Sequence, residues 1–312
     1  MKSIFLSVIM LAAFLQLTHA QSNPQAVLIR KTGGFGSKPG EMKFPAMIAA
    51  DKQSNLYVVD QHNHRIQKFD SSGNFILMWG KQGSAEGEFN YPFGIAIDSK
   101  GDVFVSDMNN NRIQQFSADG RYIRSVGRYG TANAEFKYPY GIAFDKNDVL
   151  FVIDAFNYRV QKFTNQLQFI SAWGSAESIG IKLYMPHEIA IMPDGNVVMS
   201  DRQNHRLSVF SGNGNLLRRI GDYGEGRGIK AGLFSEPHGI AFSSTGDMYV
   251  CDRYNFRVQQ GNGKNDFVYS WLTGDIFDDS KNFPLGITVG ANGHIYVTDH
   301  YAHVVSEYKL MR

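Results

Sequence analysis

The sequence lacks the features of a disulfide-stabilised protein. It contains one cysteine, Cys251, so no disulfide can form within the chain. Because Cys251 lies in an apolar run, we expect a buried structural thiol rather than a reactive one. A chain of this length buries enough apolar surface to be stabilised by its core alone. Asn-x-Ser/Thr acceptor sites are also absent, so N-glycosylation is not expected.

An excess of charge of one sign is lacking as well. Lys, Arg, Asp and Glu make up 19% of the residues, and the formal net charge is +2. Such a balanced surface gives no electrostatic reason to expect nucleic acid or acidic lipid as a partner. No window keeps a sustained 3.6-residue apolar period, which argues against long helices. The sequence therefore predicts an all-β protein.

Long apolar runs are confined to the N-terminus. Lys2 is followed by an apolar run over 4–17 and by a Thr-His-Ala ending at Ala20. This order is typical of a secretory signal peptide over 1–20, cleaved after Ala20. A membrane anchor is the alternative, but the run is too short to span a bilayer. We expect the mature chain, 21–312, to be secreted and extracellular, without membrane contact, and monomeric.

Two residue types recur at one spacing along the whole mature chain. The intervals are 47, 47, 47, 51 and 47 residues for both types. The six prolines are Pro45, Pro92, Pro139, Pro186, Pro237 and Pro284, and the six aspartates are Asp60, Asp107, Asp154, Asp201, Asp252 and Asp299. A shared register of this kind indicates a true internal repeat.

Each repeat contains four short strand patterns bounded by Gly, Asp and Asn. In the second copy these patterns lie at 91–98, 103–107, 112–116 and 122–127. A four-stranded unit repeated six times suits radial packing, in which each sheet buries its faces against its neighbours. The repeats are expected at about 34–80, 81–127, 128–174, 175–221, 222–272 and 273–312.

The two chain ends distinguish a closed ring from an open solenoid, which is the alternative. The sixth repeat stops after three strand patterns, and the missing fourth pattern stands before the first repeat, at 26–33. The sequence therefore predicts a single-domain six-bladed β-propeller of four-stranded antiparallel blades. The N-terminal strand is expected to close the last blade.

The recurrent Asp-x-x-Asn-x-Arg pattern, as in Asp107, Asn110 and Arg112, and the Pro-x-Gly-Ile-Ala pattern resemble those of NHL-repeat propellers. This resemblance implies the fold and leaves the function open. The carboxylate can accept hydrogen bonds from loop amides and from the arginine, so we interpret the pattern as structural. The predicted pairs are Asp60/Arg65, Asp107/Arg112, Asp154/Arg159, Asp201/Arg206 and Asp252/Arg257. Blade six departs from the pattern, with Ala302 and Val304 in place of Asn and Arg.

Antiparallel pairing places the residue after each proline and the residue after each aspartate at one mouth of the ring. The first ring is expected to contain Ala46, Phe93, Tyr140, His187, His238 and Leu285, and the second Gln61, Met108, Ala155, Arg202, Arg253 and His300. Blades one to three thus contribute mostly apolar groups, and blades four to six contribute imidazoles and guanidiniums. The remaining histidines of the loops, His62, His64, His205 and His303, are expected at the surface.

This asymmetry predicts a site at the mouth of blades four to six. Its candidate ligand-binding residues are His187, Glu188, Arg202, His238, Arg253 and His300, and the long loop over 225–232 is expected to open on the same face. The arginines would hold a carboxylate, and the imidazoles with Glu188 could bind Zn²⁺. Alternatively, these groups only fill a wet channel mouth. The leading hypothesis is a binding module for an extracellular peptide, protein or small anionic ligand.

The chain also resembles the peptidyl-α-hydroxyglycine α-amidating lyases, on Pro186-His187, Pro237-His238 and Asp201-Arg202. The resemblance implies a zinc-dependent lyase as the alternative function. The implied metal ligands are His187 and His238, and His300 could complete the set only by a geometry different from that of the family; the catalytic candidates are Arg202, Arg253 and Tyr254. The two Pro-His histidines lie on adjacent blades, whereas those of the lyase family lie on alternate blades. We therefore favour a protein without catalytic activity.

Overall fold

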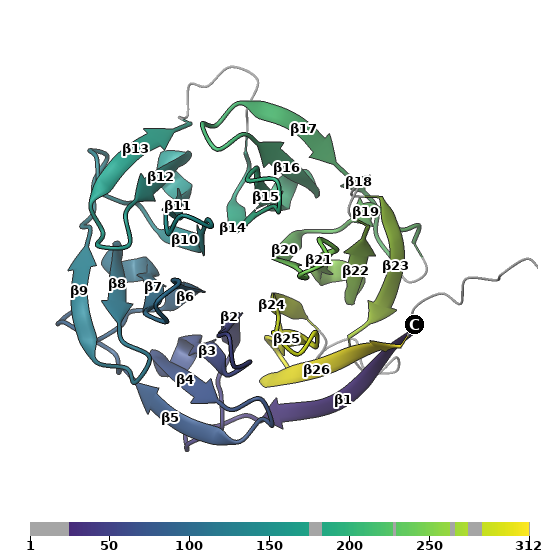
Figure 1. Cartoon of the computed structure of the whole chain (residues 1–312), viewed down its shortest axis with the longest axis horizontal. Helices are drawn as coiled ribbons and strands as arrows, with labels where there is room; N and C mark the ends of the chain where they lie inside the picture. The colour runs from purple at the N-terminus through teal and green to yellow at the C-terminus, as the bar shows by residue number, and fades with distance from the viewer. Residues whose placement is uncertain (1–24, 175–182, 227–228, 263–265, 274–282, 312) are drawn as a thin grey trace, which may run out of the picture.

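The computed structural model describes residues 25–174, 183–226, 229–262, 266–273 and 283–311. Six four-stranded antiparallel sheets are arranged radially around a central axis (Figure 1). The chain is a six-bladed β-propeller, so the fold predicted from the repeat is confirmed. The predicted signal peptide and its cleavage position lie outside the described residues. Within the described ranges, no helix is long and apolar enough to cross a membrane.

Each blade runs from an inner strand at the axis to an outer strand at the rim. Blades one and two comprise β2 (Pro45–Ala50), β3 (Leu56–Asp60), β4 (Arg65–Phe69) and β5 (Phe75–Trp79), then β6 (Pro92–Ile97), β7 (Val103–Asp107), β8 (Arg112–Phe116) and β9 (Tyr122–Val126). Blades three and four comprise β10 (Pro139–Phe144), β11 (Leu150–Asp154), β12 (Arg159–Phe163) and β13 (Phe169–Trp173), then β14 (Pro186–Ile191), β15 (Val197–Asp201), β16 (Arg206–Phe210) and β17 (Leu216–Ile220).

Blade five comprises β20 (Pro237–Phe242), β21 (Met248–Asp252), β22 (Arg257–Gly261) and β23 (Phe267–Leu272). A short parallel pair, β18 (Asp222–Tyr223) and β19 (Leu233–Phe234), precedes it. Blade six comprises β24 (Pro284–Val289), β25 (Ile295–Asp299), β26 (Val304–Met311) and β1 (Gln25–Gly33). Short 3₁₀ turns follow the second strands of blades one to five, at η1 (Gln61–Asn63), η2 (Met108–Asn110), η3 (Ala155–Asn157), η4 (Arg202–Asn204) and η5 (Arg253–Asn255).

Burial follows the radial position of each strand. Every residue of the second strands is buried, as in β3 and β7, because both faces of the sheet pack against neighbouring blades. The outer strands β5 and β13 alternate between half-buried and exposed residues, since one of their faces meets solvent. Cys251 lies in β21 with no exposed surface, so the predicted structural thiol is confirmed.

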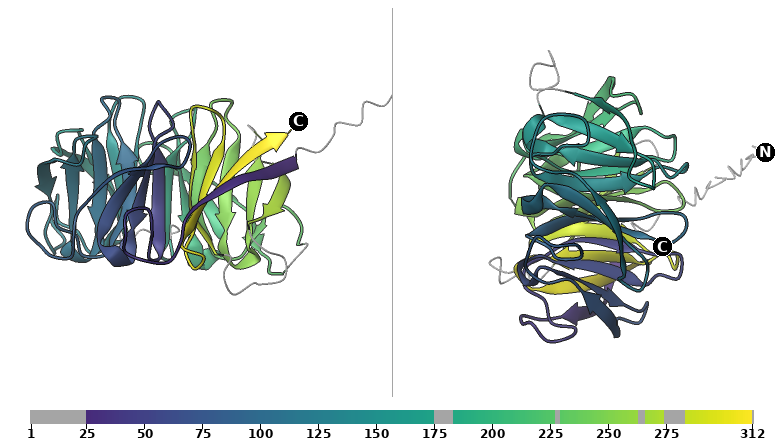
Figure 2. Two further views of the ribbon diagram at one scale, coloured as in Figure 1. Left: turned by 90° about the horizontal axis from the view of Figure 1, so that it is seen from below. Right: turned by 90° about the vertical axis from the view of Figure 1, so that its left-hand side faces the viewer.

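The N-terminal strand closes the ring. β1 pairs antiparallel with β26, from Gln25 opposite Met311 to Gly33 opposite Val304. Figure 2 shows the two strands side by side at the rim of blade six. The amide of Ala26 also donates to the hydroxyl of Tyr269 in blade five, at 2.9 Å. The closure inferred from the two chain ends is therefore confirmed.

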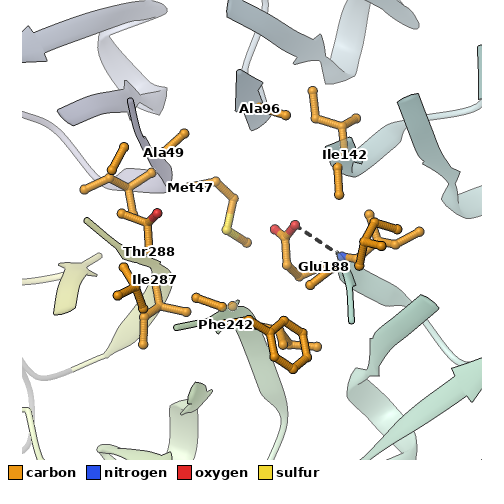
Figure 3. Close-up of a pocket in the computed structure, with 18 of the residues that line it drawn as sticks. Met47, Ala49, Ala96, Ile142, Glu188, Phe242, Ile287 and Thr288 are labelled. Atoms are coloured by element: carbon orange, nitrogen blue, oxygen red, sulfur yellow. Dashed lines mark hydrogen bonds between the residues drawn. The ribbon is translucent and has the colours of Figure 1, made fainter. Parts of the chain in front are cut away.

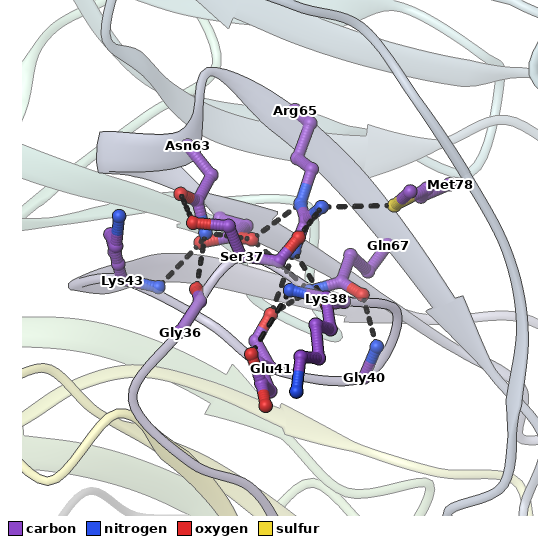
Figure 4. A network of polar contacts seen from close by, with 11 residues as sticks. Gly36, Ser37, Lys38, Gly40, Glu41, Lys43, Asn63, Arg65, Gln67 and Met78 are labelled. Carbon is purple, nitrogen blue, oxygen red and sulfur yellow. Dashed lines mark hydrogen bonds and ion pairs between the residues drawn. The ribbon is translucent and has the colours of Figure 1, made fainter.

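The repeated aspartates and arginines hold the loops of blades one to five in place, and Figure 4 shows this network in blade one. In blade one, Asp60 accepts hydrogen bonds from Arg65 Nε at 2.7 Å, from the amide of Lys43 at 2.7 Å and from Asn63 Nδ2. Arg65 also donates to the carbonyl oxygen of Glu41 at 2.8 Å. All five predicted pairs form, with N–O distances from 2.7 to 3.0 Å. The predicted structural role of the pattern is confirmed.

A bulge in each inner strand determines which side chains reach the axis. In blade four, Pro186 pairs with Asp201 and Ile189 with Met199, so two residues lie opposite one between these pairs. The same register shift occurs in blade two, where the second bulge residue is Gly94. A Cβ at Gly94 would lie 2.5 Å from the carbonyl oxygen of Tyr140 in the next blade. Glycine is therefore required there, whereas blade four carries Glu188 at the equivalent place.

Candidate functional site at the mouth of blades four and five

The bulge of β14 and the end of β15 bring His187 and Arg202 together. The guanidinium Nη1 of Arg202 lies 3.4 Å from His187 Nε2. The imidazole of His238, from the next blade, has its ring centroid 4.6 Å from that of His187. Arg253 and Tyr254 follow β21 in the 3₁₀ turn η5. We call His187, Arg202, His238, Arg253 and Tyr254 the mouth site.

The two imidazoles of the mouth site pack in a row with other first-ring residues. Phe93, Tyr140, His187 and His238 contact one another in sequence, with ring centroids 4.6 to 4.9 Å apart. Ala46, at the same place in blade one, is fully buried in the same core cluster as Phe93. The two imidazoles therefore form part of a packed row of first-ring side chains.

Both imidazoles of the mouth site are neutral. Burial, followed by the charges of Arg202 and Arg253, holds the pKa of His187 well below its usual value. Burial has the same effect on the pKa of His238, with the neighbouring His187 as the next cause. His238 Nδ1 lies 2.9 Å from the carbonyl oxygen of Glu236 and so carries the proton. His187 Nδ1 and His238 Nε2 are buried and have no hydrogen-bond partner among the described residues.

The two arginines differ in how their charge is balanced. Arg202 forms an ion pair with Glu236, in which Nε and Nη2 both contact Oε2, at 2.7 and 2.6 Å. Arg253 has no ion pair within the described part of the chain, and its Nε is buried without a partner. Its guanidinium lies 5.2 Å from the ring centroid of Tyr254 and 5.6 Å from that of Phe283. Burial lowers the pKa of Arg253, with the charge of Arg202 acting in the same direction.

His300 does not join the imidazole pair. Its Nδ1 lies 3.1 Å from the carbonyl oxygen of Pro45, and its ring contacts Phe44 and Tyr301. Burial lowers the pKa of His300 to about 4. The described residues contain no group of three or more His, Cys, Asp or Glu side chains that could hold a metal ion. A catalytic zinc site needs three protein ligands, which the imidazole pair alone does not supply.

The side chain of Glu188 points away from the mouth site, because His187 and Glu188 are consecutive residues of the bulge in β14 and project in different directions. Its side chain lines the central channel together with Met47 and Ile142 (Figure 3). Sequence reasoning grouped Glu188 with the imidazoles because it follows His187 directly. The bulge separates the two side chains.

A cavity of about 530 Å³ adjoins the mouth site between blades four and five. Tyr254 and Glu236 line it on one side, and His205, Tyr223 and Glu225 on the other. Glu225 belongs to the long loop that was expected to open on this face, and its carboxylate accepts a hydrogen bond from the Tyr223 hydroxyl at 2.5 Å. Glu236 was not predicted from the sequence. The sequence does contain a signal that could have identified it. Glu236 stands directly before Pro237, at a place where blades one to three carry the aromatic residues Phe44, Tyr91 and Tyr138.

Three loop histidines join neighbouring blades. Nδ1 of His64, His205 and His303 accepts a hydrogen bond from the amide of the residue before the next blade's proline, at 3.0 to 3.1 Å. The expected surface position is wrong for His64, whose side chain is buried. His64 has a left-handed backbone with a φ of 53°, a conformation that the partly exposed His205 shares. Burial lowers the pKa of His64 and of His303, so both can act as neutral acceptors.

Four segments of the chain match the model of the NHL repeat, at 89–116, 183–210, 234–260 and 282–308. A segment of 51 residues is 39% identical to the protein brain tumor of Drosophila melanogaster and covers 16% of this chain and 5% of that protein. A segment of 77 residues is 32% identical to a probable peptidyl-alpha-hydroxyglycine alpha-amidating lyase of Caenorhabditis elegans and covers 23% of this chain and 22% of the relative. The matched segments thus span less than a quarter of either relative.

Several solved structures share the fold at low sequence identity. A streptogramin B lyase superposes with a TM-score of 0.61 at 13% identity and covers 93% of this chain and 98% of its own. A gluconolactonase from Xanthomonas campestris superposes with a TM-score of 0.65 at 13% identity and covers 94% of this chain and 99% of its own. A Bacteroides thetaiotaomicron protein of unknown function gives 0.71 at 15% identity, covering 93% and 76%. Identities this low show the fold alone. The chain is therefore a six-bladed β-propeller that contains NHL repeats.

Proposed function

We propose that the chain is an exported binding propeller whose mouth site holds an anionic group of a peptide, protein or small ligand. The observation that carries this proposal is the guanidinium of Arg253. It is half-buried, its Nε is buried without a hydrogen-bond partner, and it lies over two aromatic rings without an ion pair among the described residues. A buried charge without a partner is costly, and a ligand carboxylate would supply that partner with charge-assisted hydrogen bonds.

The surroundings of Arg253 suit a peptide-like ligand. Neutral His187 and His238 add no like charge to the site, and the Arg202–Glu236 pair is already balanced. The adjoining cavity of about 530 Å³ is lined by two tyrosines, a histidine, a serine and two glutamates, of which Glu236 is paired with Arg202 and Glu225 is bound to Tyr223. The tyrosine rings can cover an apolar or aromatic side chain of the ligand. Arginine and tyrosine are also the residue types that dominate binding energy at protein interfaces.

The proposal is tested with N-acetyl-phenylalanyl-glycine as the carboxylate probe and its C-terminal amide as the neutral counterpart. Calorimetry should show that the carboxylate binds, and that the amide binds about tenfold more weakly or worse, because a charge-assisted hydrogen bond is lost. Arg253→Gln should cause a similar loss. Arg218→Gln, on the exposed face of β17, is the matched control and should bind as the unchanged protein does. Equal affinity for acid and amide would refute an anion site at Arg253.

A zinc-dependent lyase remains the second hypothesis, supported by the imidazole pair and by the short match to the Caenorhabditis elegans relative. His187 and His238 offer two ligand nitrogens, and His300 is bound to Pro45 instead. The residues present therefore do not fit a three-ligand zinc centre. Elemental analysis of the purified mature protein, together with an assay for glyoxylate release from an α-hydroxyglycine peptide, tests this hypothesis directly.

A further inference from the structure

The central channel is a second concave site, separate from the mouth site. It has a volume of about 320 Å³ and is lined by the inner strands of the six blades. Its lining extends to Ile97, Phe242 and Val289 at the far ends of these strands, away from the mouth. The lining contains none of the first-ring residues, so the channel shares no residue with the mouth site.

One carboxylate projects into this channel, whose other lining side chains are uncharged and mostly aliphatic. Glu188 is the only ionisable side chain among the residues that line it, and the remaining lining is alanine, isoleucine and other uncharged residues. Within the described chain, Glu188 accepts one hydrogen bond, from the amide of Ile189 to Oε1 at 3.2 Å. Figure 3 shows its carboxylate near the centre of the channel, with Met47 of blade one pointing towards it. No basic side chain of the lining balances its charge.

Such a position is energetically unfavourable for an ionised group. Burial raises the pKa of Glu188 to about 8, because the charged form is poorly solvated there. The charge of Glu188 also affects the thiol of Cys251. The pKa of this thiol is raised mainly by burial and to a smaller extent by nearby carboxylates, including Glu188. The repeat does not require a carboxylate here, since glycine stands at this place in blades two, three, five and six. Glu188 is thus a departure from the repeat that points into a cavity.

We propose that the central channel binds a small primary alkylammonium ion, with Glu188 as the counter-ion and the aliphatic lining covering the alkyl chain. The cation would supply the missing charge partner, and the pair would be stronger in this apolar setting than in water. The volume equals that of about ten water molecules at roughly 30 Å³ each, and so admits a ligand with a similar number of heavy atoms. Ile142, Ile240 and Ile287 are among the side chains that would contact the chain of the ligand.

The test compares three six-carbon probes, hexylammonium, hexanol and hexanoate, by calorimetry on the full mature chain. At pH 9, where Glu188 is ionised, hexylammonium should bind at least tenfold more tightly than hexanol, and hexanoate should not bind, because its charge would face that of Glu188. Glu188→Gln should remove the preference for hexylammonium. Between pH 7 and 9, the affinity for hexylammonium should rise in the unchanged protein, as Glu188 ionises, and stay flat in the variant.

Three controls make the result decisive. Glu86→Gln removes an exposed carboxylate and should change nothing. Glu188→Gly introduces the residue of four other blades, so it should keep the fold and lose the preference for the cation. Arg253→Gln should leave hexylammonium binding unchanged, which separates this channel from the mouth site. Three results would overturn the proposal. Hexylammonium and hexanol could bind equally well, both Glu188 variants could bind hexylammonium as tightly as the unchanged protein does, or the unchanged protein could fail to bind hexylammonium.

Discussion

Replacement of aspartate by asparagine is expected to have opposite effects on stability in blades two and six. Asp107 and Asp299 occupy the same place in the repeat, at the end of a buried second strand. Asp107 is paired with Arg112 at 2.8 Å, whereas blade six has Val304 at the position of the arginine. The two substitutions remove the same charge from two different environments.

Asp107→Asn should lower the free energy of unfolding by about 3–5 kcal/mol, the usual cost of removing one partner of a buried ion pair. The carboxylate is fully buried and the Arg112 side chain is 12% exposed, so solvent cannot replace the lost partner. Burial raises the pKa of Asp107, and the amide of Asn90, Asn110 and Arg112 oppose that rise. The substitution leaves Arg112 charged and without a carboxylate.

Asp299→Asn should be neutral or stabilising at neutral pH. Burial raises the pKa of Asp299 to about 6, with only the amides of its own loop and distant Lys31 opposing it. Because the folded pKa lies above the unfolded one, the contribution to stability is fully present below about pH 4. It is lost as pH rises through about 6. At roughly 1.4 kcal/mol per pKa unit, the ionised carboxylate disfavours the fold by about 3 kcal/mol at pH 7.5.

Urea unfolding of both variants and of the unchanged protein at pH 5 and 7.5 measures these effects. The advantage of Asp299→Asn over the unchanged protein should shrink by about 1–2 kcal/mol at pH 5, where the native carboxyl is mostly protonated. Asp107→Asn should be destabilised at both pH values. Comparable destabilisation by the two substitutions at pH 7.5 would refute the idea that the arginine decides the role of this aspartate.

Three further outcomes are expected. His64→Ala should lower the free energy of unfolding by about 1 kcal/mol at pH 7.5, since the amide of Tyr91 loses its acceptor. In the unchanged protein this contribution is present above pH 6.5 and is lost as pH falls through the lowered pKa of His64. Urea unfolding should therefore show a smaller loss of unfolding free energy for His64→Ala at pH 5.5 than at pH 7.5. Deletion of 25–33 should lower the melting temperature and speed proteolysis of β26, which would become an unpaired edge. Treatment with EDTA should leave the melting temperature unchanged. This expectation would be contradicted if the purified protein contained a full equivalent of zinc and the His187→Ala variant did not.

The fold was predictable because its determinants repeat. Six prolines and six aspartates mark strand ends at nearly constant intervals, and short strand patterns bounded by Gly, Asp and Asn recur with them. The closing strand at 26–33 was also readable, because a missing fourth pattern at one end was matched by an extra one at the other. An unpaired strand edge is unfavourable, so the extra strand pattern at one end is expected to pair with the blade that lacks a strand at the other.

The site was predictable only in part, because side-chain direction depends on details that the sequence does not display. His187 and Arg202 were expected at one mouth, and the ladder from Pro186 to Asp201 brings them together. Glu188 was assigned to the same group, since neighbours in sequence were taken as neighbours in space, and the bulge turns it into the channel. Burial of His64 was likewise not readable, because His205 shares its Asn-His-Arg context and its φ of 53° and yet stays partly exposed.

The pairing of β1 with β26 also constrains how this protein acquires its structure. Residues about 286 positions apart, Gln25 and Met311, must meet before the ring is complete. Contacts between such distant residues form late and slow folding, because the intervening chain loses much conformational freedom. Blades one to five can form from contiguous chain, while blade six waits for both ends. Until then, β26 is an exposed strand edge, so the nearly finished ring is the species most prone to pair with a second molecule.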